Sequence, residues 1–550
     1  MRIGIDLDNT LLNYDMAFHV ASKYLGLALP KNVQTKSEIR DFARSQLRNE
    51  LLWQQLQGLA YGRYIKEYAK LFPGVKRFLW RCQCLGHQVM IVSHKTEYGH
   101  FDAKRISLRE AALDCLRANG LMESLDPLIT KVFFEHTQAD KIQRIKELEF
   151  DIFIDDLPEV IYKLIEFPEL TTIFFSPESF SSLDIKISGS NIVTAQDWQK
   201  IDDYINGSWK KADIEAVVKK LFHQPIAMIE NLKLGGNAGL YKISFLNGKK
   251  IKLKIYPFDS KHDRIKSEFE GLTALNKYGL QNVPKPILRD SDFEIGAYTW
   301  IDGHPVEKYD QSHIQSCLDF LHSLHNIREA REFSNFLPAS AACFSGNDIV
   351  SQIESRQIQF DLSREIYVEL DSFFEQDFNP CVGQIISWAK KNWPKDIDFE
   401  SQLPREEQVL SPSDFGFHNV IQQADGSLVF IDFEYFGWDD PVKLISDFIF
   451  HPSMSLSQEQ KLYWIVGTLK IYGFHIHARL RAALPLYGLI WCLIVLNDYR
   501  PIVWQRRLLA DESKRARRSQ ILKQKLEQAK QLLMKIQLNY QQFVPEVLCP

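Results

Sequence analysis

The chain has 550 residues, a hydrophobic content of 45%, a charged content of 25% and a formal net charge of −4. This length exceeds what one hydrophobic core serves, so about two to four domains are expected, and the charge argues against a nucleic-acid-binding protein. Eight scattered cysteines and the lack of a secretory signal predict reduced thiols in a cytoplasmic protein.

The first 200 residues alternate predicted strands with predicted helices. Strand-like apolar runs stand at 2–5, 88–92, 132–134, 152–154 and 172–175, and helical patterns such as 140–148 lie between them. This alternation predicts an α/β domain at about 1–205, with a parallel, Rossmann-like sheet covered by helices on both faces. Mostly helical, aromatic-rich sequence at about 14–70 predicts a helical cap inserted between the first two strands.

Polar side chains follow the ends of these predicted strands or open the helix after them. They are, in chain order, Asp6, Asp8, Thr10, Ser93, Lys141, Asp155 and Asp156. Because the carboxyl ends of parallel strands meet at one edge of a sheet, we expect these groups to converge. One carboxylate can attack phosphorus and another can protonate the leaving oxygen, while the remaining groups hold the phosphoryl oxygens and Mg²⁺. The set predicts a phosphate-ester hydrolase.

Residues 1 to about 200 resemble the haloacid dehalogenase superfamily of phosphatases, whose four motifs match Asp6-x-Asp8-x-Thr10, Ser93, Lys141 and Asp155-Asp156. The resemblance implies that Asp6 is the nucleophile and Asp8 the general acid/base, assisted by Ser93 and Lys141. It also implies an Mg²⁺ site among Asp6, Asp8, Asp155 and Asp156, with Asp156 as a direct ligand. Because Asp8 is present, the resemblance favours a phosphatase over a dehalogenase.

A second type of sequence begins after about residue 212. The runs 241–246 and 249–255 flank Asn247-Gly248, which predicts an antiparallel hairpin with a type I′ turn. The glycine cluster before it, with Gly235 and Gly236, could wrap nucleotide phosphates with backbone N–H groups.

Charged residues on and after this hairpin could form the lysine–acid pair that a kinase uses on nucleotide phosphates. Lys252 and Lys254 share one face of the second strand, and Glu268 and Glu270 lie on the helical run that follows. These patterns leave the choice within each pair open.

A short β island at 409–433 interrupts the mainly helical sequence that begins near 306. It carries Asp414, then Asn419, then Asp432 just after the apolar run 428–431. A strand–turn–strand with these three side chains converges them on one metal–nucleotide site, with a base for an acceptor hydroxyl.

Residues 212 to about 500 resemble the aminoglycoside phosphotransferase and choline kinase-like family. Besides the island, the segment 300–303 resembles its hinge, and Asp439-Asp440-Pro441 with Asp447 resembles its segment after the metal aspartate. The resemblance implies a two-lobed, protein-kinase-like α+β fold that uses ATP or another nucleoside triphosphate.

The same resemblance assigns roles to single residues. It makes Asp414 the catalytic base, Asn419 and Asp432 the Mg²⁺ ligands, and Lys254 the partner of Glu268. One position departs from the family, because Pro412 stands where a histidine usually precedes the catalytic aspartate.

The remaining sequence predicts helices. The apolar run 482–496 is shorter than the roughly 20 residues that span a bilayer, so it predicts a buried core helix and no membrane span. The stretch 506–535 predicts one long amphipathic helix, a C-terminal extension of a domain at about 212–550.

Together these features predict a bifunctional phosphatase and ATP-dependent small-molecule kinase. We expect hydroxyl-bearing and phosphate-ester substrates such as sugars or sugar phosphates, with action at different positions, since opposed reactions on one hydroxyl would only consume ATP. The alternative is a phosphatase regulated by a nucleotide-binding pseudokinase, which Pro412 keeps open. Antibiotic resistance through a kinase alone would leave the complete phosphatase set without a purpose.

Overall fold

The computed structural model describes residues 1–30, 32–46, 48–99, 104–122, 126–177, 191–232, 239–257, 263–510 and 512–545. The chain divides into two compact units, Met1–Gln224 and Pro225–Pro550. The division lies after helix α10 (Lys211–Phe222), later than the boundary at about 205–212 expected from the sequence. Helix α10 packs on α5 (Val75–Cys84), and Asp213 of α10 pairs with Arg81 of α5, which places α10 in the first unit.

The first unit is built on a six-stranded parallel sheet with the order β5-β4-β1-β6-β7-β8. Its strands are β1 (Arg2–Ile5), β4 (Gln88–His94), β5 (Lys131–Glu135), β6 (Ile152–Asp155), β7 (Thr171–Phe175) and β8 (Ile192–Ala195). Five of them confirm the predicted runs. The edge strand β8 was missed because it is only partly buried and lacks a continuous apolar run, whereas the equally short inner strands β1 and β6 carry the fully buried residues typical of parallel sheets.

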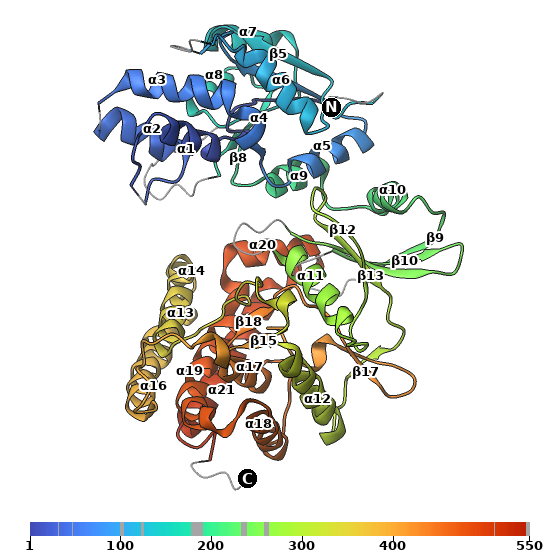
Figure 1. The fold of residues 1–550 in the computed structure, drawn as a ribbon, viewed down its shortest axis with the longest axis vertical. Helices are drawn as coiled ribbons and strands as arrows, with labels where there is room; N and C mark the ends of the chain where they lie inside the picture. Colours follow the sequence, from blue (N-terminus) through green and yellow to red (C-terminus); the bar gives the residue numbers. More distant parts are fainter. Residues whose placement is uncertain are drawn as a thin grey trace. The chain divides into compact units, whose positions relative to one another are not determined.

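Helices cover this sheet and form the cap. They are α1 (Asp15–Tyr24), α2 (Lys36–Asp41), α3 (Glu50–Gly58), α4 (Ile65–Tyr68), α5, α6 (Leu108–Ala118), α7 (Gln138–Glu147), α8 (Pro158–Leu164), α9 (Trp198–Asn206) and α10. The cap helices α1 to α4, drawn in blue in Figure 1, lie between β2 (Leu12–Asn13) and β3 (Lys70–Leu71). Because β2 and β3 pair with each other, the cap leaves and rejoins the core at one place.

The second unit begins with a five-stranded antiparallel sheet with the order β12-β13-β11-β10-β9. Its strands are β9 (Ile226–Asn231), β10 (Gly239–Phe245), β11 (Lys250–Ile255), β12 (Pro286–Asp290) and β13 (Ile295–Thr299). The predicted β10–β11 hairpin is confirmed, but its turn is not type I′. Gly248 has φ +83° and Asn247 has no positive φ, because Leu246 lengthens the connection into the three-residue form that ends in a glycine bulge.

The rest of the second unit is mainly helical and is drawn from green, at α11, to red in Figure 1. Its helices are α11 (Arg264–Lys277), α12 (Gln311–Ile327), α13 (Gly346–Ile358), α14 (Asp361–Ile366), α15 (Val368–Ser372), α16 (Asn379–Asn392), α17 (Pro441–Phe450), α18 (Gln458–Tyr472), α19 (His477–Val495), α20 (Pro501–Ala510) and α21 (Arg518–Asn539). Short strands interrupt them: β14 (His304–Pro305), β15 (Val409–Ser411), β16 (Val420–Gln422), β17 (Leu428–Phe430) and β18 (Gly437–Asp439). A sheet followed by a helical part agrees with the predicted two-lobed arrangement.

Helix α19 is the centre of the helical part. It packs against α13, α16, α17 and α21, and nearly all of its side chains are buried. By length and hydropathy the stretch Phe474–Tyr499 could cross a membrane, but 83% of its apolar window is buried inside the protein, as a core helix would be. The predicted single helix at 506–535 is wrong, because α20 ends at Ala510 and α21 begins at Arg518. The apolar face of helix α21, which includes Leu526 and Leu533, packs against α19.

Buried charge fixes α9 and α10 to α5. Arg81, which is fully buried, lies 2.9 Å from Asp202 and 3.4 Å from Asp213. Arg81→Leu would leave Asp213 buried without its cation and Asp202 with only the longer contact to Arg77 at 3.7 Å, and we expect it to lower the free energy of unfolding of the first unit by roughly 3–5 kcal/mol. Arg117→Leu, which breaks the exposed pair with Asp114, should cost less than about 1 kcal/mol. Thermal unfolding of both variants tests this, and equal shifts would contradict it.

Candidate functional site

Lys141 joins two carboxylates at the carboxyl edge of the parallel sheet. Its Nζ lies 2.6 Å from Asp6 Oδ1, just after β1, and 2.6 Å from Asp155 Oδ2, at the end of β6. All three side chains are almost fully buried. Burial alone would lower the pKa of Lys141, but the charges of Asp155 and Asp6 outweigh it and raise that pKa above its ordinary value. The lysine is therefore a permanent cation within this cluster.

Asp156 completes a group of three carboxylates. Oxygens of Asp6, Asp155 and Asp156 lie within 4.8 Å of one another. Thr10 Oγ1 donates to Asp156 at 3.1 Å and Asn9 Nδ2 at 3.3 Å. Burial raises the pKa of Asp155 to about 7 and that of Asp156 to about 6. Three oxygen donors that repel one another suit a hard divalent cation such as Mg²⁺, which would relieve this repulsion.

Asp8 is engaged outside that group. Lys95 Nζ lies 3.0 and 2.7 Å from its two carboxylate oxygens, and the Tyr14 hydroxyl donates to Oδ1 at 2.6 Å. Burial would raise the pKa of Asp8, but the contact with Lys95 brings it below its ordinary value. Ser93 is buried near the end of β4, the neighbour of β1, and so lies at the same edge of the sheet.

Two lysines of this site had no predicted role. Lys95 directly follows β4, and its Nζ stands 4.5 Å from the centre of the Tyr61 ring. Lys36 opens cap helix α2; burial lowers its pKa, but Tyr61, Asp156 and Asp8 raise it above the ordinary value. No sequence signal distinguishes Lys36 from other lysines, since only the fold of the cap brings it to the carboxylates.

Lys254 is a buried lysine among carboxylates in the second unit, as Lys141 is in the first. Its Nζ lies 2.8 Å from Glu268 of α11 and 2.8 Å from Glu434, and it also bonds Asp432. Burial opposes its charge, but these carboxylates, Asp432 first, raise its pKa well above the ordinary value. Glu434 was not predicted as a partner, although it stands only two residues after Asp432.

The structure also distinguishes the alternatives that the sequence left open. The Tyr256 hydroxyl donates to Glu268 at 2.6 Å and lies 2.7 Å from the Tyr298 hydroxyl, so Glu268 belongs to a buried network. Glu270 instead pairs with Arg289 near the surface. Lys252 is next to Lys254 on the same face of β11, where burial and the charge of Lys254 lower its pKa.

Asp414 and Asn419 lie in the loop between β15 and β16. Asn419 Nδ2 donates to the Asp414 carbonyl at 2.9 Å, and the Asn419 carbonyl accepts from Ile431 N at 2.9 Å, which holds Asn419 beside the segment of Asp432. Asp432 has φ +69° and Ser413 has φ +68°. Such left-handed backbone in non-glycine residues costs about 1–3 kcal/mol each and is concentrated at functional sites.

Two histidines surround Asp414, and neither was predicted. His418 Nε2 lies 2.9 Å from Asp414 Oδ1 and His451 Nε2 lies 3.6 Å from it, while the two rings stack at 3.9 Å. Burial and the neighbouring His418 lower the pKa of His451 to about 4. His418 thus contacts the carboxylate in a loop where Pro412 replaces the expected histidine; its place inside the Asp414–Asn419 motif was the available signal.

Other predicted residues are accounted for as follows. Gly235 and Gly236 lie outside the described residues. Asp439 and Asp447 both pair with Lys443, at 3.0 and 2.9 Å. Asp440 pairs with Arg479 at 2.6 Å. These three carboxylates therefore stabilise the packing of the helical part.

Comparison with known proteins finds a family match within the second unit. Residues 241–481 match the model of APH, the phosphotransferase enzyme family, so this part of the chain is a phosphotransferase-type domain; the first unit lies outside the match. No curated protein matches the chain.

Solved structures similar to the chain include spectinomycin phosphotransferase APH(9)-Ia with ADP and spectinomycin, at 15% identity and a TM-score of 0.43, covering 61% of this chain and 99% of that one. The gentamicin complex of APH(2″)-IIa shows 16% identity and a TM-score of 0.39, with coverages of 61% and 99%. Choline kinase LicA from Streptococcus pneumoniae shows 16% identity and a TM-score of 0.38, with coverages of 58% and 98%.

The three-carboxylate group of the first unit predicts stabilisation by Mg²⁺. At about 100 times the dissociation constant, a cation that binds only the folded unit adds about 2.7 kcal/mol to its stability. We expect Mg²⁺ to raise the melting temperature of wild-type protein, and Asp156→Asn to remove most of that increase because it takes away one oxygen charge. Asp114→Asn, at an exposed position, should respond like wild type. A Mg²⁺ response that persists in Asp156→Asn would place the cation elsewhere.

Proposed function

We propose that the chain is a bifunctional enzyme, with an ATP-dependent kinase for small-molecule hydroxyls in the second unit and a phosphomonoester hydrolase in the first. The observation that carries the kinase is the convergence of Lys254, Glu268, Asn419 and Asp432 around the Asp414 loop, within a segment that matches a phosphotransferase family. The hydrolase rests on Asp6, Lys141 and Asp155 at the sheet edge.

In the kinase reaction Asp414 accepts the proton of the acceptor hydroxyl. The acceptor oxygen then bonds to the γ-phosphorus, and the bond from that phosphorus to the bridging oxygen of ADP breaks. Lys254, fixed by Glu268, holds the nucleotide phosphates. Asn419 and Asp432 would hold Mg²⁺, which supplies positive charge against the phosphate oxygens. His418 keeps the Asp414 carboxylate in place and so performs the orienting work that Pro412 cannot.

In the hydrolase reaction an Asp6 oxygen attacks phosphorus while the ester P–O bond breaks, and Asp8 gives a proton to the leaving oxygen. Water then attacks the aspartyl phosphate and passes a proton to Asp8, which releases phosphate and restores both residues. Lys95 favours the ionised Asp8 that the second step needs. A bound phosphate competes for Lys95, which frees Asp8 to carry the proton of the first step.

The two reactions serve one pathway at different positions of sugar-like or sugar-phosphate-like metabolites. Each site has its own complete set of side chains, so neither needs a group from the other. Opposed action on one hydroxyl would give continuous ATP consumption without product, which is the outcome that would replace this part of the proposal.

Asp6→Asn should abolish phosphate release, by about a thousandfold or more, because it removes the nucleophilic oxygen and keeps the shape of the side chain. ATP-dependent phosphorylation should remain. Phosphate release from a panel of phosphomonoesters measures the first effect, and Asp114→Asn is the matched control at an exposed position. Near-normal release by Asp6→Asn would refute the assignment of the nucleophile.

Asp414→Asn should abolish ATP-dependent phosphorylation while leaving phosphate release and nucleotide binding intact, since this carboxylate serves the acceptor hydroxyl. Asp432→Asn should instead weaken Mg²⁺-dependent nucleotide binding by about tenfold or more, because it removes a charged ligand. Calorimetry with a non-hydrolysable ATP analogue and an acceptor screen measure the two effects, with the exposed Asp425→Asn as control. Nucleotide binding without any Asp414-dependent ATP consumption would favour the regulatory pseudokinase.

A further inference from the structure

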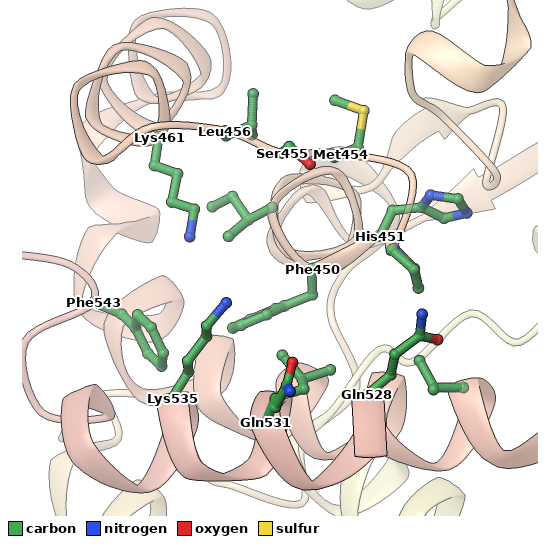
Figure 2. A pocket seen from close by; sticks show the side chains of 14 residues that line it. Phe450, His451, Met454, Ser455, Leu456, Lys461, Gln528, Gln531, Lys535 and Phe543 are labelled. Atoms are coloured by element: carbon green, nitrogen blue, oxygen red, sulfur yellow. The ribbon is translucent and has the colours of Figure 1, made fainter. Parts of the chain in front are cut away.

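A pocket of about 460 Å³ lies beside the loop that carries Asp414. It is lined by the end of α17, the segment that follows it, α18 and α21, as Figure 2 shows. Phe450, Leu456 and Phe543 form an apolar part of its wall, and Gln528 and Gln531 add amide groups from α21. This volume is within the range of small-molecule sites, about 300–1,000 Å³.

Two lysines face this pocket from different helices. Lys461 belongs to α18 and Lys535 to α21, and Figure 2 shows their side chains directed toward each other across the opening. Burial and the charge of Lys535 lower the pKa of Lys461. The residues that line the pocket include no Asp or Glu, and in the described ranges of the chain no carboxylate forms an ion pair with either lysine. Two like charges that face one pocket without a lining carboxylate disfavour each other's charged form, and an anion from outside would relieve that repulsion.

The pocket shares two wall residues with the environment of Asp414. His451 lines it, stacks on His418 and approaches Asp414 Oδ1 to 3.6 Å. Met454 also lines it, and its sulfur accepts a hydrogen bond from Phe417 N at 3.4 Å within the same loop. A small molecule in the pocket therefore lies next to the side chains that surround the proposed base.

We propose that this pocket binds the acceptor of the kinase through an anionic group, a phosphate or carboxylate, placed between Lys461 and Lys535. The inference rests on the proposed kinase function and adds the charge of its substrate. The amide of Gln528 donates to the same anion or to sugar hydroxyls, as does the second N–H of Gln531, whose Nε2 also donates to Glu527 at 3.0 Å. The apolar wall packs against the carbon skeleton. Lys535 lies on helix α21, outside the matched segment 241–481.

An anionic acceptor also defines the product. When the kinase adds a phosphoryl group to a molecule that already carries one, the product has two phosphate esters. A phosphomonoester hydrolase is the class of enzyme that removes one of them. If the hydrolase removes the phosphate that the acceptor already carried, the compound keeps only the phosphate added by the kinase. The kinase reaction would then precede the hydrolase reaction.

Protection of lysines from acetylation tests binding without reference to catalysis. The full-length Asp6→Asn protein would be acetylated with Mg-ADP present and with glucose 6-phosphate, glucuronate, glucose or glucosamine as probes, and the label would be quantified by mass spectrometry. We expect the anionic probes to protect Lys461 and Lys535 several-fold. Lys530, exposed on α21 and outside the pocket, is the matched control and should label equally throughout. Protection by glucose 6-phosphate alone would identify a site specific for phosphate. Protection by glucuronate as well would identify a site for anions in general.

The second arm measures turnover with the acceptor found by an ATP-consumption screen. Lys461→Gln with Lys535→Gln should raise KM for that acceptor by about ten- to a hundredfold, since charge-assisted bonds are lost, and leave KM for ATP unchanged. Lys530→Gln should change neither. Protection without ATP consumption would uphold the anion site and reject the kinase. Absence of protection by both anionic probes, or equal protection by glucose or glucosamine, would overturn the anion site even in an active kinase.

Discussion

In each unit a buried lysine joins carboxylates that come from different elements, and the rest of each site depends on that arrangement. Lys141 lies between Asp6 and Asp155, and Lys254 bonds Glu268, Asp432 and Glu434. Without these ammonium groups the buried carboxylates would repel one another and take up protons, because burial disfavours their charged form. The partners come from different strands and helices, so each lysine also fixes how those elements meet.

Much of this arrangement could be predicted because it follows from local patterns. Apolar runs that end in carboxylates predicted the two central strands of the parallel sheet, β1 and β6, and the carboxyl ends of parallel strands lie at the same edge of the sheet. Asp6 and Asp155 therefore meet across the neighbouring strands β1 and β6. In the second unit, the predicted hairpin and the predicted β island likewise placed Lys254 and Asp432 at the ends or on the faces of short strands.

What could not be predicted depends on tertiary packing. Lys36 reaches the first site only because the cap folds over it, and His451 reaches Asp414 only because α17 ends beside the loop. The tail shows the same limit, since its uniform amphipathic pattern gave no sign that α20 ends at Ala510 and that a separate helix starts at Arg518. The type of hairpin turn depended on whether Leu246 belongs to the strand or to the turn, and the alternation of apolar and polar residues does not show this.

The packing of α21 on α19 has a consequence for synthesis on the ribosome. Gly488 of α19 leaves room for Ile536 of α21, whose side chain would stand only 2.9 Å from an added Cβ. The last helix therefore closes over an almost wholly apolar one that emerged earlier. The first unit draws its contacts from the first 224 residues and can fold while the chain is still growing. The second must keep α19 shielded until α21 arrives, which makes this interval the point at which a nascent chain most needs a chaperone.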